Sequence, residues 1–196
     1  DAIGCQTQIA QAVLDAGADY VLAVKGNQKT LHDGISWYEV SGGSGTSSSS
    51  SSFGEIRVED NTGATAISGA DSAFGANAAQ FLGYDTNGES MNTTPDHTND
   101  HITIDKAGKY WCLCTFSVRA TGGSQGFSGA IFKNNKGTQL GARCTMSLNT
   151  SATLYSGVCS TIADLSANDT IEFWIQNESS AADITVEDSS LVVRSL

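Results

Sequence analysis

The alternation of apolar and polar residues is clearest in residues 102–118, which read ITIDKAGKYWCLCTFSV. Two runs, 102–105 and 110–118, alternate with a period of two, which is typical of β strands, and the glycine-containing segment between them predicts a turn. One face of the second run is wholly apolar: Tyr110, Cys112, Cys114, Phe116 and Val118. Its other face begins with Trp111 and Leu113 and then becomes polar. This pattern predicts a strand that lines a core on one side and contacts a second surface on the other.

The sequence from Phe53 onward contains many short runs of this kind, separated by turn residues. We expect further strands over 54–59, 64–68, 79–84, 127–133, 139–147, 153–162, 170–176, 184–187 and 190–194. Residues 85–88 predict a turn, and residues 90–100 predict a polar loop. Short strands at about ten-residue spacing favour an all-β sandwich or jelly roll, and the 21 glycines and single proline agree with this class.

Residues 1–35 follow a different pattern. Residues 6–16 have apolar side chains at helical spacing, and the continuous apolar run at 20–24 is typical of a strand buried on both faces. A second helix is expected to start after that strand, which makes this a short N-terminal α/β segment. Residues 36–52 contain SGGSGTSSSSSS, a Ser/Gly-rich composition that predicts a linker. The chain therefore divides into 1–35, 36–52 and a β domain over 53–196.

The words DAIGCQ, DYVLAVKGNQ and TLHD in residues 1–35 resemble the DDE transposases of the ISAs1 (H-repeat-associated) family. The resemblance implies an RNase H-like enzyme whose paired metal ions activate water for strand cleavage. Asp1 matches one catalytic carboxylate of that family, but the family's other acidic ligands lie outside the matching segment, and nothing after Ile35 resembles them. One carboxylate cannot hold two metal ions, so we expect an inactive fragment.

Four motifs within residues 53–196 resemble the C1q/TNF-like jelly-roll domain. They occur in the family's order: ITIDKAGKYWCLCTFSV, IFKNNKG, LSANDTIEFWI and SSLVVRSL. The sequence departs from the family at Asn168, where glycine is usual, and in the closing strand, which lacks the aromatic pair of classical C1q domains. The resemblance implies a homotrimer that displays loops at one end. We interpret Trp111 as a subunit contact, because the opposite face of its strand already supplies a core, and leave Trp174 open between core and contact.

The charge of the chain limits its partners. The formal net charge is −11, and between residues 36 and 105 Arg57 is the only basic residue against ten acidic ones. Binding to nucleic acid through phosphates requires a basic face, so we expect no nucleic-acid partner and interpret the acidic excess as a contribution to solubility. The sequence shows no transmembrane run and no signal-peptide pattern, so we expect no membrane partner.

None of the five cysteines belongs to a CxxC pair, so neither a zinc knuckle nor a redox motif is indicated. Cys112 and Cys114 share a face with aromatic residues and are interpreted as small buried hydrophobic residues. A disulfide between Cys144 and Cys159 across a hairpin remains an open alternative.

The segment DHTNDH supplies a candidate metal site made of Asp96, His97, Asp100 and His101. Imidazoles and carboxylates four residues apart can share a metal ion on a helix, but this segment follows Pro95 and leads into a strand, so a solvated turn is the preferred interpretation. The chain contains neither a GxSxG motif nor a Ser-His-Asp order. We therefore predict no catalytic, cofactor-binding or metal-binding residues, and no cofactor.

The sequence favours a non-enzymatic, homotrimeric structural or adhesive module on a virion, outside the cell or at a cell surface. A phage capsid-decoration protein, a fibre head and a subunit of a bacterial surface appendage all fit this description. Its partners would be copies of itself and a capsid, a fibre or a cell-surface receptor, with the loop at 120–126 free to touch the partner. Two alternatives stay open: a C1q-like recognition head that binds a glycan or protein receptor, and an inactive transposase remnant.

Overall fold

The computed structural model describes residues 51–121, 124–149 and 153–196. The predicted α/β segment over 1–35 and nearly all of the linker over 36–52 lie outside the described residues. The secondary structure of the described part consists of strands alone. These are β1 (Phe53–Val58), β2 (Ala64–Thr65), β3 (Ala79–Gln80), β4 (Thr86–Asn87), β5 (Thr93–Asp96), β6 (His101–Ile104), β7 (Gly108–Ala120), β8 (Gln125–Lys133), β9 (Thr138–Leu148), β10 (Tyr155–Leu165), β11 (Thr170–Asn177) and β12 (Ile184–Ser195). Within the same ranges, no helix has the length and hydropathy needed to cross a bilayer.

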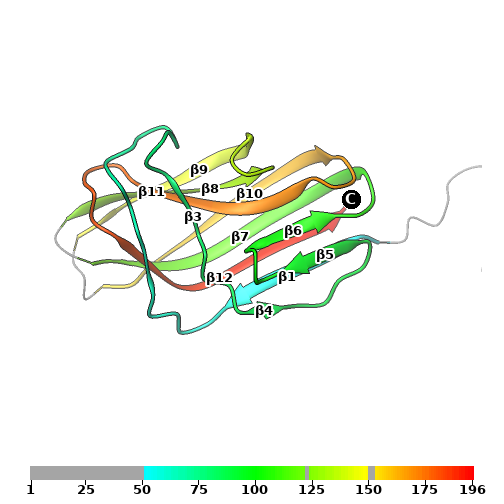
Figure 1. The fold of residues 1–196 in the computed structure, drawn as a ribbon, viewed down its shortest axis with the longest axis horizontal. Helices are drawn as coiled ribbons and strands as arrows, with labels where there is room; N and C mark the ends of the chain where they lie inside the picture. The colour runs from blue at the N-terminus through cyan, green and yellow to red at the C-terminus, as the bar shows by residue number, and fades with distance from the viewer. Residues whose placement is uncertain (1–50, 122–123, 150–152) are drawn as a thin grey trace, which may run out of the picture. The chain divides into compact units, whose positions relative to one another are not determined.

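The strands form two antiparallel sheets that enclose a core (Figure 1). In the first sheet the order is β10-β7-β12-β1-β4, and β2 pairs with β12. In the second sheet the order is β5-β6-β11-β8-β9, and β3 pairs with β11. Many neighbouring strands come from distant parts of the sequence, such as β1 and β12, whereas β5 with β6 and β8 with β9 are consecutive. The predicted β sandwich is thus confirmed.

Side chains that point between the sheets form the main core. The five residues predicted to face it from β7 are all buried: Tyr110, Cys112, Cys114, Phe116 and Val118. The ring of Phe116 stacks on that of Phe173 from the second sheet, with centroids 5.1 Å apart. Alternation along β7 therefore identified the core face correctly, because every second side chain of a strand points to the same side of its sheet.

Residues 102–118 contain both predicted strands, but these do not pair with each other. β6 pairs with β5 and β11 in the second sheet, whereas β7 pairs with β10 and β12 in the first. The intervening turn carries the chain from one sheet to the other. The apolar alternation specifies that each run is a strand facing a core, but it does not specify which strand lies beside it.

Two segments predicted as irregular form short strands. Within the expected loop at 90–100, β5 pairs with β6, and within the expected turn at 85–88, β4 pairs with β1. Both strands lie at the edge of a sheet and are held by backbone hydrogen bonds, which do not need apolar side chains. Their polar sequences therefore gave no strand signal.

Two predicted strand boundaries are also wrong. The expected strands at 184–187 and 190–194 are one strand, β12, whose register shifts between Val186 and Asp188. The expected strand at 79–84 ends at Gln80. A bulge adds a residue without ending a strand, so the break in alternation within β12 was misread as a gap.

Candidate functional site

Strands β10, β7 and β12 lie side by side in the first sheet (Figure 1). The outer face of these three strands carries a group of apolar side chains. Ile162 on β10 lies opposite Trp111 on β7, and Val192 on β12 lies opposite Leu113. Ser160 on β10 lies opposite Leu113, and Val158 lies two residues before Ser160 on the same face of β10. We call these five apolar residues the Trp111 patch. They point away from the core, because their neighbours along β7 and β12 are buried and those along β10 are buried or partly buried.

Three members of the Trp111 patch are strongly exposed. The exposed fraction is 38% for Trp111, 53% for Val158 and 60% for Ile162. The Trp111 indole Nε1 donates a hydrogen bond to Ser160 Oγ at 2.7 Å, which fixes the ring against β10. Adjoining exposed apolar side chains are a feature of surfaces that bind other molecules, so we treat the Trp111 patch as the candidate site.

Charged groups of both signs border the Trp111 patch. Lys109 Nζ lies 3.2 Å from a carboxylate oxygen of Asp164 at one end of the β7–β10 pair. Arg194 lies opposite Trp111 on β12. A polar rim of this kind around an apolar centre is the usual anatomy of a protein–protein interface.

The same sheet face becomes polar beyond the patch, where a hollow of about 390 Å³ opens. Its lining includes Arg57, Thr115, Ser117, Ser156 and Asp188. Ser117 and Ser156 lie opposite each other on β7 and β10, with their hydroxyl oxygens 3.3 Å apart. The hollow therefore combines hydroxyl and charged groups of the outer face with apolar lining from Val58 and Phe116.

The outer face of the second sheet is covered by the protein's own chain. Residues between β2 and β3 lie over it. Two of them, Phe74 and Ala78, form a second, smaller apolar cluster with three residues of the sheet: Ala130, Phe132 and Trp174. Lys136 Nζ lies 5.0 Å from the centre of the Trp174 ring and also donates to the carbonyl of Gly75. The structure thus assigns Trp174 to an internal cluster, and the apolar surface of this sheet is already occupied.

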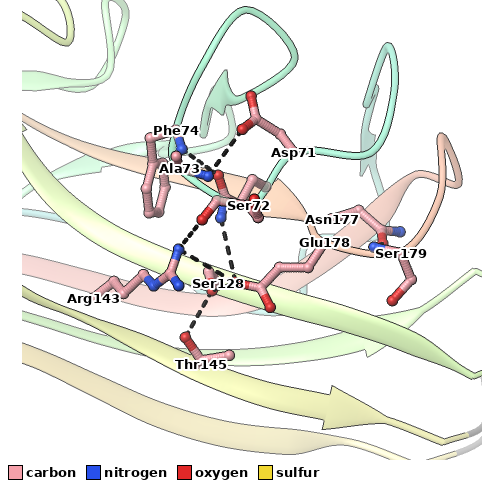
Figure 2. Close-up of polar contacts among 11 residues, drawn as sticks. Asp71, Ser72, Ala73, Phe74, Ser128, Arg143, Thr145, Asn177, Glu178 and Ser179 are labelled. Atoms are coloured by element: carbon pink, nitrogen blue, oxygen red, sulfur yellow. Dashed lines mark hydrogen bonds and ion pairs between the residues drawn. The ribbon is translucent and has the colours of Figure 1, made fainter.

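Polar contacts tie the covering loop to the second sheet (Figure 2). The Arg143 guanidinium on β9 points to the carbonyl of Ser72 and lies 3.5 Å from a carboxylate oxygen of Glu178. Ser128 Oγ donates to the same Glu178 oxygen at 2.6 Å and lies 2.8 Å from Thr145 Oγ1. Because each of these groups has a partner within the chain, we interpret them as a support for the loop.

The candidate metal segment forms a hairpin connection and not a helix. Asp96 ends β5 and lies opposite His101, which begins β6. The Asp96 carboxylate accepts backbone N–H groups of Thr98 and Asn99 at 3.0 and 3.1 Å, as in a tight turn. Among the residues that the structure describes, no group of three or more His, Cys, Asp or Glu side chains is arranged to hold a metal ion.

Burial alters the chemistry of the core cysteines. Cys112, Cys114, Cys144 and Cys159 are all free thiols, of which Cys144 is partly exposed and the other three are buried. The structure therefore contains no Cys144–Cys159 disulfide, and the two residues lie on strands of different sheets and not across a hairpin. Burial raises the pKa of the Cys112 thiol to about 12, and it raises the pKa of the Cys114 thiol further. Thiols with such pKa values are poor nucleophiles, which agrees with their interpretation as small hydrophobic residues.

Comparison with curated proteins finds short matches. No family model matches the chain. An uncharacterized protein in the dhlA 3' region of Xanthobacter autotrophicus is 60% identical over 35 residues, and the putative transposase YncI of Escherichia coli K12 is 62% identical over 32 residues. These matches cover 18% and 16% of this chain, and the chain spans 12% and 13% of the length of those two relatives. They give weak support to the transposase resemblance of residues 1–35.

Comparison with solved structures concerns the β domain. Eiger TNF from S. frugiperda superimposes with a TM-score of 0.50 at 14% identity, over 74% of this chain and 93% of that chain. The fold is TNF-like. Murine APRIL at pH 5.0 is also similar, with a TM-score of 0.48 at 13% identity over 74% of this chain and 99% of that one. The TNF-like fold agrees with the C1q/TNF-like resemblance of the four sequence motifs, and identities this low extend to the fold alone.

Sequence reasoning identified Trp111 and Leu113 as outward-facing but missed Val158, Ile162 and Val192. The signal was present in β10, where Val158 and Ile162 alternate with small residues. Because the inward positions of β10 include Gly157 and Cys159, the larger apolar side chains on the other face could have been recognised as a surface feature.

Proposed function

We propose that residues 53–196 form a homotrimeric, non-enzymatic structural or adhesive module that assembles through the Trp111 patch. The observation that carries the proposal is the exposure of Trp111, Val158 and Ile162 side by side on one sheet face. Complete burial of one Val or Ile side chain contributes about 1.5–3 kcal/mol. Covering this face with copies of the same chain would therefore favour association.

The threefold arrangement is proposed from the resemblance to C1q/TNF-like domains, and the rim of the patch is compatible with it. In a ring of three, each copy presents one part of its surface to a different part of its neighbour. Such a contact can pair the exposed Lys109 or Arg194 of one copy with acidic groups of the next. With a net charge of −11, the chain needs such pairs, because unpaired acidic surfaces of two copies repel each other.

We place this module on a virion, outside the cell or at a cell surface, with a capsid, a fibre or a receptor as its further partner. Support comes from the composition, which lacks a basic face for nucleic acid, and from a sheet scaffold that leaves the loops between strands at its ends. No enzymatic role is proposed.

The assembly can be tested by light scattering on the full chain. We expect a mass about three times the 20.4 kDa of one chain. Ile162→Asp and Trp111→Glu each place a carboxylate in the patch, and a buried unpaired charge opposes association, so we expect both variants to shift toward the monomer. Leu82→Asp is the matched control, because Leu82 is 68% exposed and lies outside the patch.

Three results would contradict the proposal. These are a wild-type chain that is monomeric at all concentrations, patch variants that keep the wild-type mass, and a Leu82 variant that dissociates as readily as the patch variants.

A further inference from the structure

β9 and β10 belong to different sheets but run past each other at the edge of the sandwich. A Cβ atom placed on Gly157 of β10 would lie 2.8 Å from Met146 Cε of β9, and one placed on Gly141 of β9 would lie 2.6 Å from Thr161 Cβ of β10. Residue numbers rise along β9 as they fall along β10 at these contacts, so the two strands run antiparallel here. We call this line of contact the β9–β10 seam. This antiparallel order brings Cys144 on β9 next to Cys159 on β10, between the two contacts.

The thiol of Cys159 is directed toward β9. Its sulfur donates to the carbonyl of Gly129 at 3.2 Å, and Gly129 is the residue directly opposite Cys144 in the β8–β9 ladder. Cys144 is among the groups that shift the pKa of the Cys159 thiol, which places it close to that sulfur. Cys144 itself packs against the main core while staying partly exposed.

Cys114 is the competing partner, because it lies opposite Cys159 in the β7–β10 ladder. Its sulfur, however, approaches Ser189 Oγ at 3.7 Å and the Tyr84 hydroxyl at 3.9 Å, on the side of β12. The Cys159 thiol also raises the pKa of Cys114, so these two thiols lie close to each other as well. Cys144 is the preferred partner because it is partly exposed, so that a small disulfide can reach it from solvent, whereas Cys114 is buried.

We propose that Cys144 and Cys159 are a modification site that forms a disulfide across the β9–β10 seam when the protein meets a low-molecular-weight disulfide such as oxidised glutathione. The partly exposed Cys144 attacks first: its thiolate displaces one glutathione thiolate and forms a mixed disulfide. The sulfur of Cys159, having lost its proton, then attacks the Cys144 sulfur and releases the second glutathione. In total, the two protein thiols lose two electrons and form one disulfide, and one molecule of oxidised glutathione gains these electrons and becomes two thiols.

Burial raises the pKa of Cys159 to about 12, so the second step is expected to be slower than the first. The product joins the two sheets at an edge where no backbone ladder connects them. A covalent link that closes a short loop restricts the unfolded chain, and we expect it to raise the Tm by about 5 °C or more.

The test uses the full chain with Cys5→Ser, so that the N-terminal cysteine cannot compete. After incubation with oxidised glutathione, we expect peptide mapping by mass spectrometry to find Cys144 linked to Cys159, and dithiothreitol to reverse both the link and the rise in Tm. Cys112→Ser is the matched control and should keep the link. Cys159→Ser should stop at glutathionylated Cys144.

A link between Cys114 and Cys159 would overturn the proposal. So would a chain in which Cys159 stays reduced while Cys144 carries glutathione, or one in which all thiols remain reduced. All three outcomes are measured on the protein in which Cys144 and Cys159 are unchanged. They therefore do not depend on whether the Cys112→Ser or Cys159→Ser variant folds.

Discussion

Asp100 has a buried carboxylate, with an exposed fraction of 6%, that accepts the backbone N–H of Tyr84 at 2.8 Å. Burial raises its pKa above the usual 3.8, with the Tyr84 bond acting in the opposite direction. A carboxyl group whose pKa is higher in the folded state contributes most to stability below its unfolded pKa, and this contribution is lost as the pH rises through the folded value. The ionised form is therefore the one that the fold tolerates less well.

Asp100→Asn tests this interpretation, since the amide keeps an acceptor oxygen for Tyr84 and cannot ionise. We expect the variant to become more stable relative to wild type as the pH rises from about 3 to 7, that is, its unfolding free energy should increase relative to that of wild type. Urea unfolding across this range measures the difference, and Asp85→Asn, at an exposed carboxylate, serves as the control. A relative stability that falls with rising pH would show that Asp100 is stabilised in its ionised form.

Asp71 organises the loop over the second sheet. Its carboxylate accepts the backbone N–H groups of Ala73 at 3.0 Å and of Asn77 at 3.2 Å, and such bonds lower its pKa. Asp71→Ala should destabilise this loop by about 1–2 kcal/mol, because hydrogen bonds to a charged acceptor are lost. Faster amide hydrogen exchange at residues 72–77, with unchanged exchange in β7, is the expected readout. Uniform exchange across the domain would contradict a local role.

At the scale of elements, long strands with a buried face were predictable and short edge strands were not. β7 and β11 carry apolar residues at every second position, and both were located within a few residues of their ends. β4 and β5 have polar sequences and exist because a neighbour offers backbone hydrogen-bonding groups. That partner comes from elsewhere in the chain, so local sequence cannot reveal it.

Gly157 permits the close passage of β9 and β10. A Cβ atom at this position would lie 2.6 Å from the Phe116 ring and 2.8 Å from Met146 Cε. We therefore expect Gly157→Ala to destabilise the domain by about 1–3 kcal/mol through overpacking, measured by urea unfolding. Gly108→Ala is the matched control, because its Cβ would lie 3.6 Å from Tyr110, an ordinary contact distance. Adding Met146→Ala should restore part of the lost unfolding free energy. If the effects of the two substitutions on the unfolding free energy are additive, the result would argue against a contact between Gly157 and Met146.

At the scale of the whole molecule, the sequence located part of the exposed apolar surface but not its extent. The excess of apolar side chains on the outer face of β7 indicated a contact surface at Trp111, and the structure confirms that this side chain faces outward. The contributions of Val158 and Ile162 became visible only when β10 was found beside β7, because a surface patch depends on which strands are neighbours. The DHTNDH segment forms the turn between β5 and β6 that the sequence favoured, because the bonds that make it are local: the Asp96 carboxylate accepts the backbone N–H groups of Thr98 and Asn99.

Assembly through the Trp111 patch has a thermodynamic consequence for the intact chain. If folded copies associate and unfolded copies do not, association stabilises the folded state by mass action, so the Tm should rise with protein concentration. We expect this rise in wild type and in Leu82→Asp, and a concentration-independent Tm in Ile162→Asp. Ile162 is 60% exposed, so its replacement should leave the fold of the single chain intact, which near-identical circular dichroism of the two variants would verify. A wild-type Tm that does not change with concentration, in a chain that light scattering finds to be trimeric, would mean that the subunits separate before they unfold and that the patch contributes little to stability.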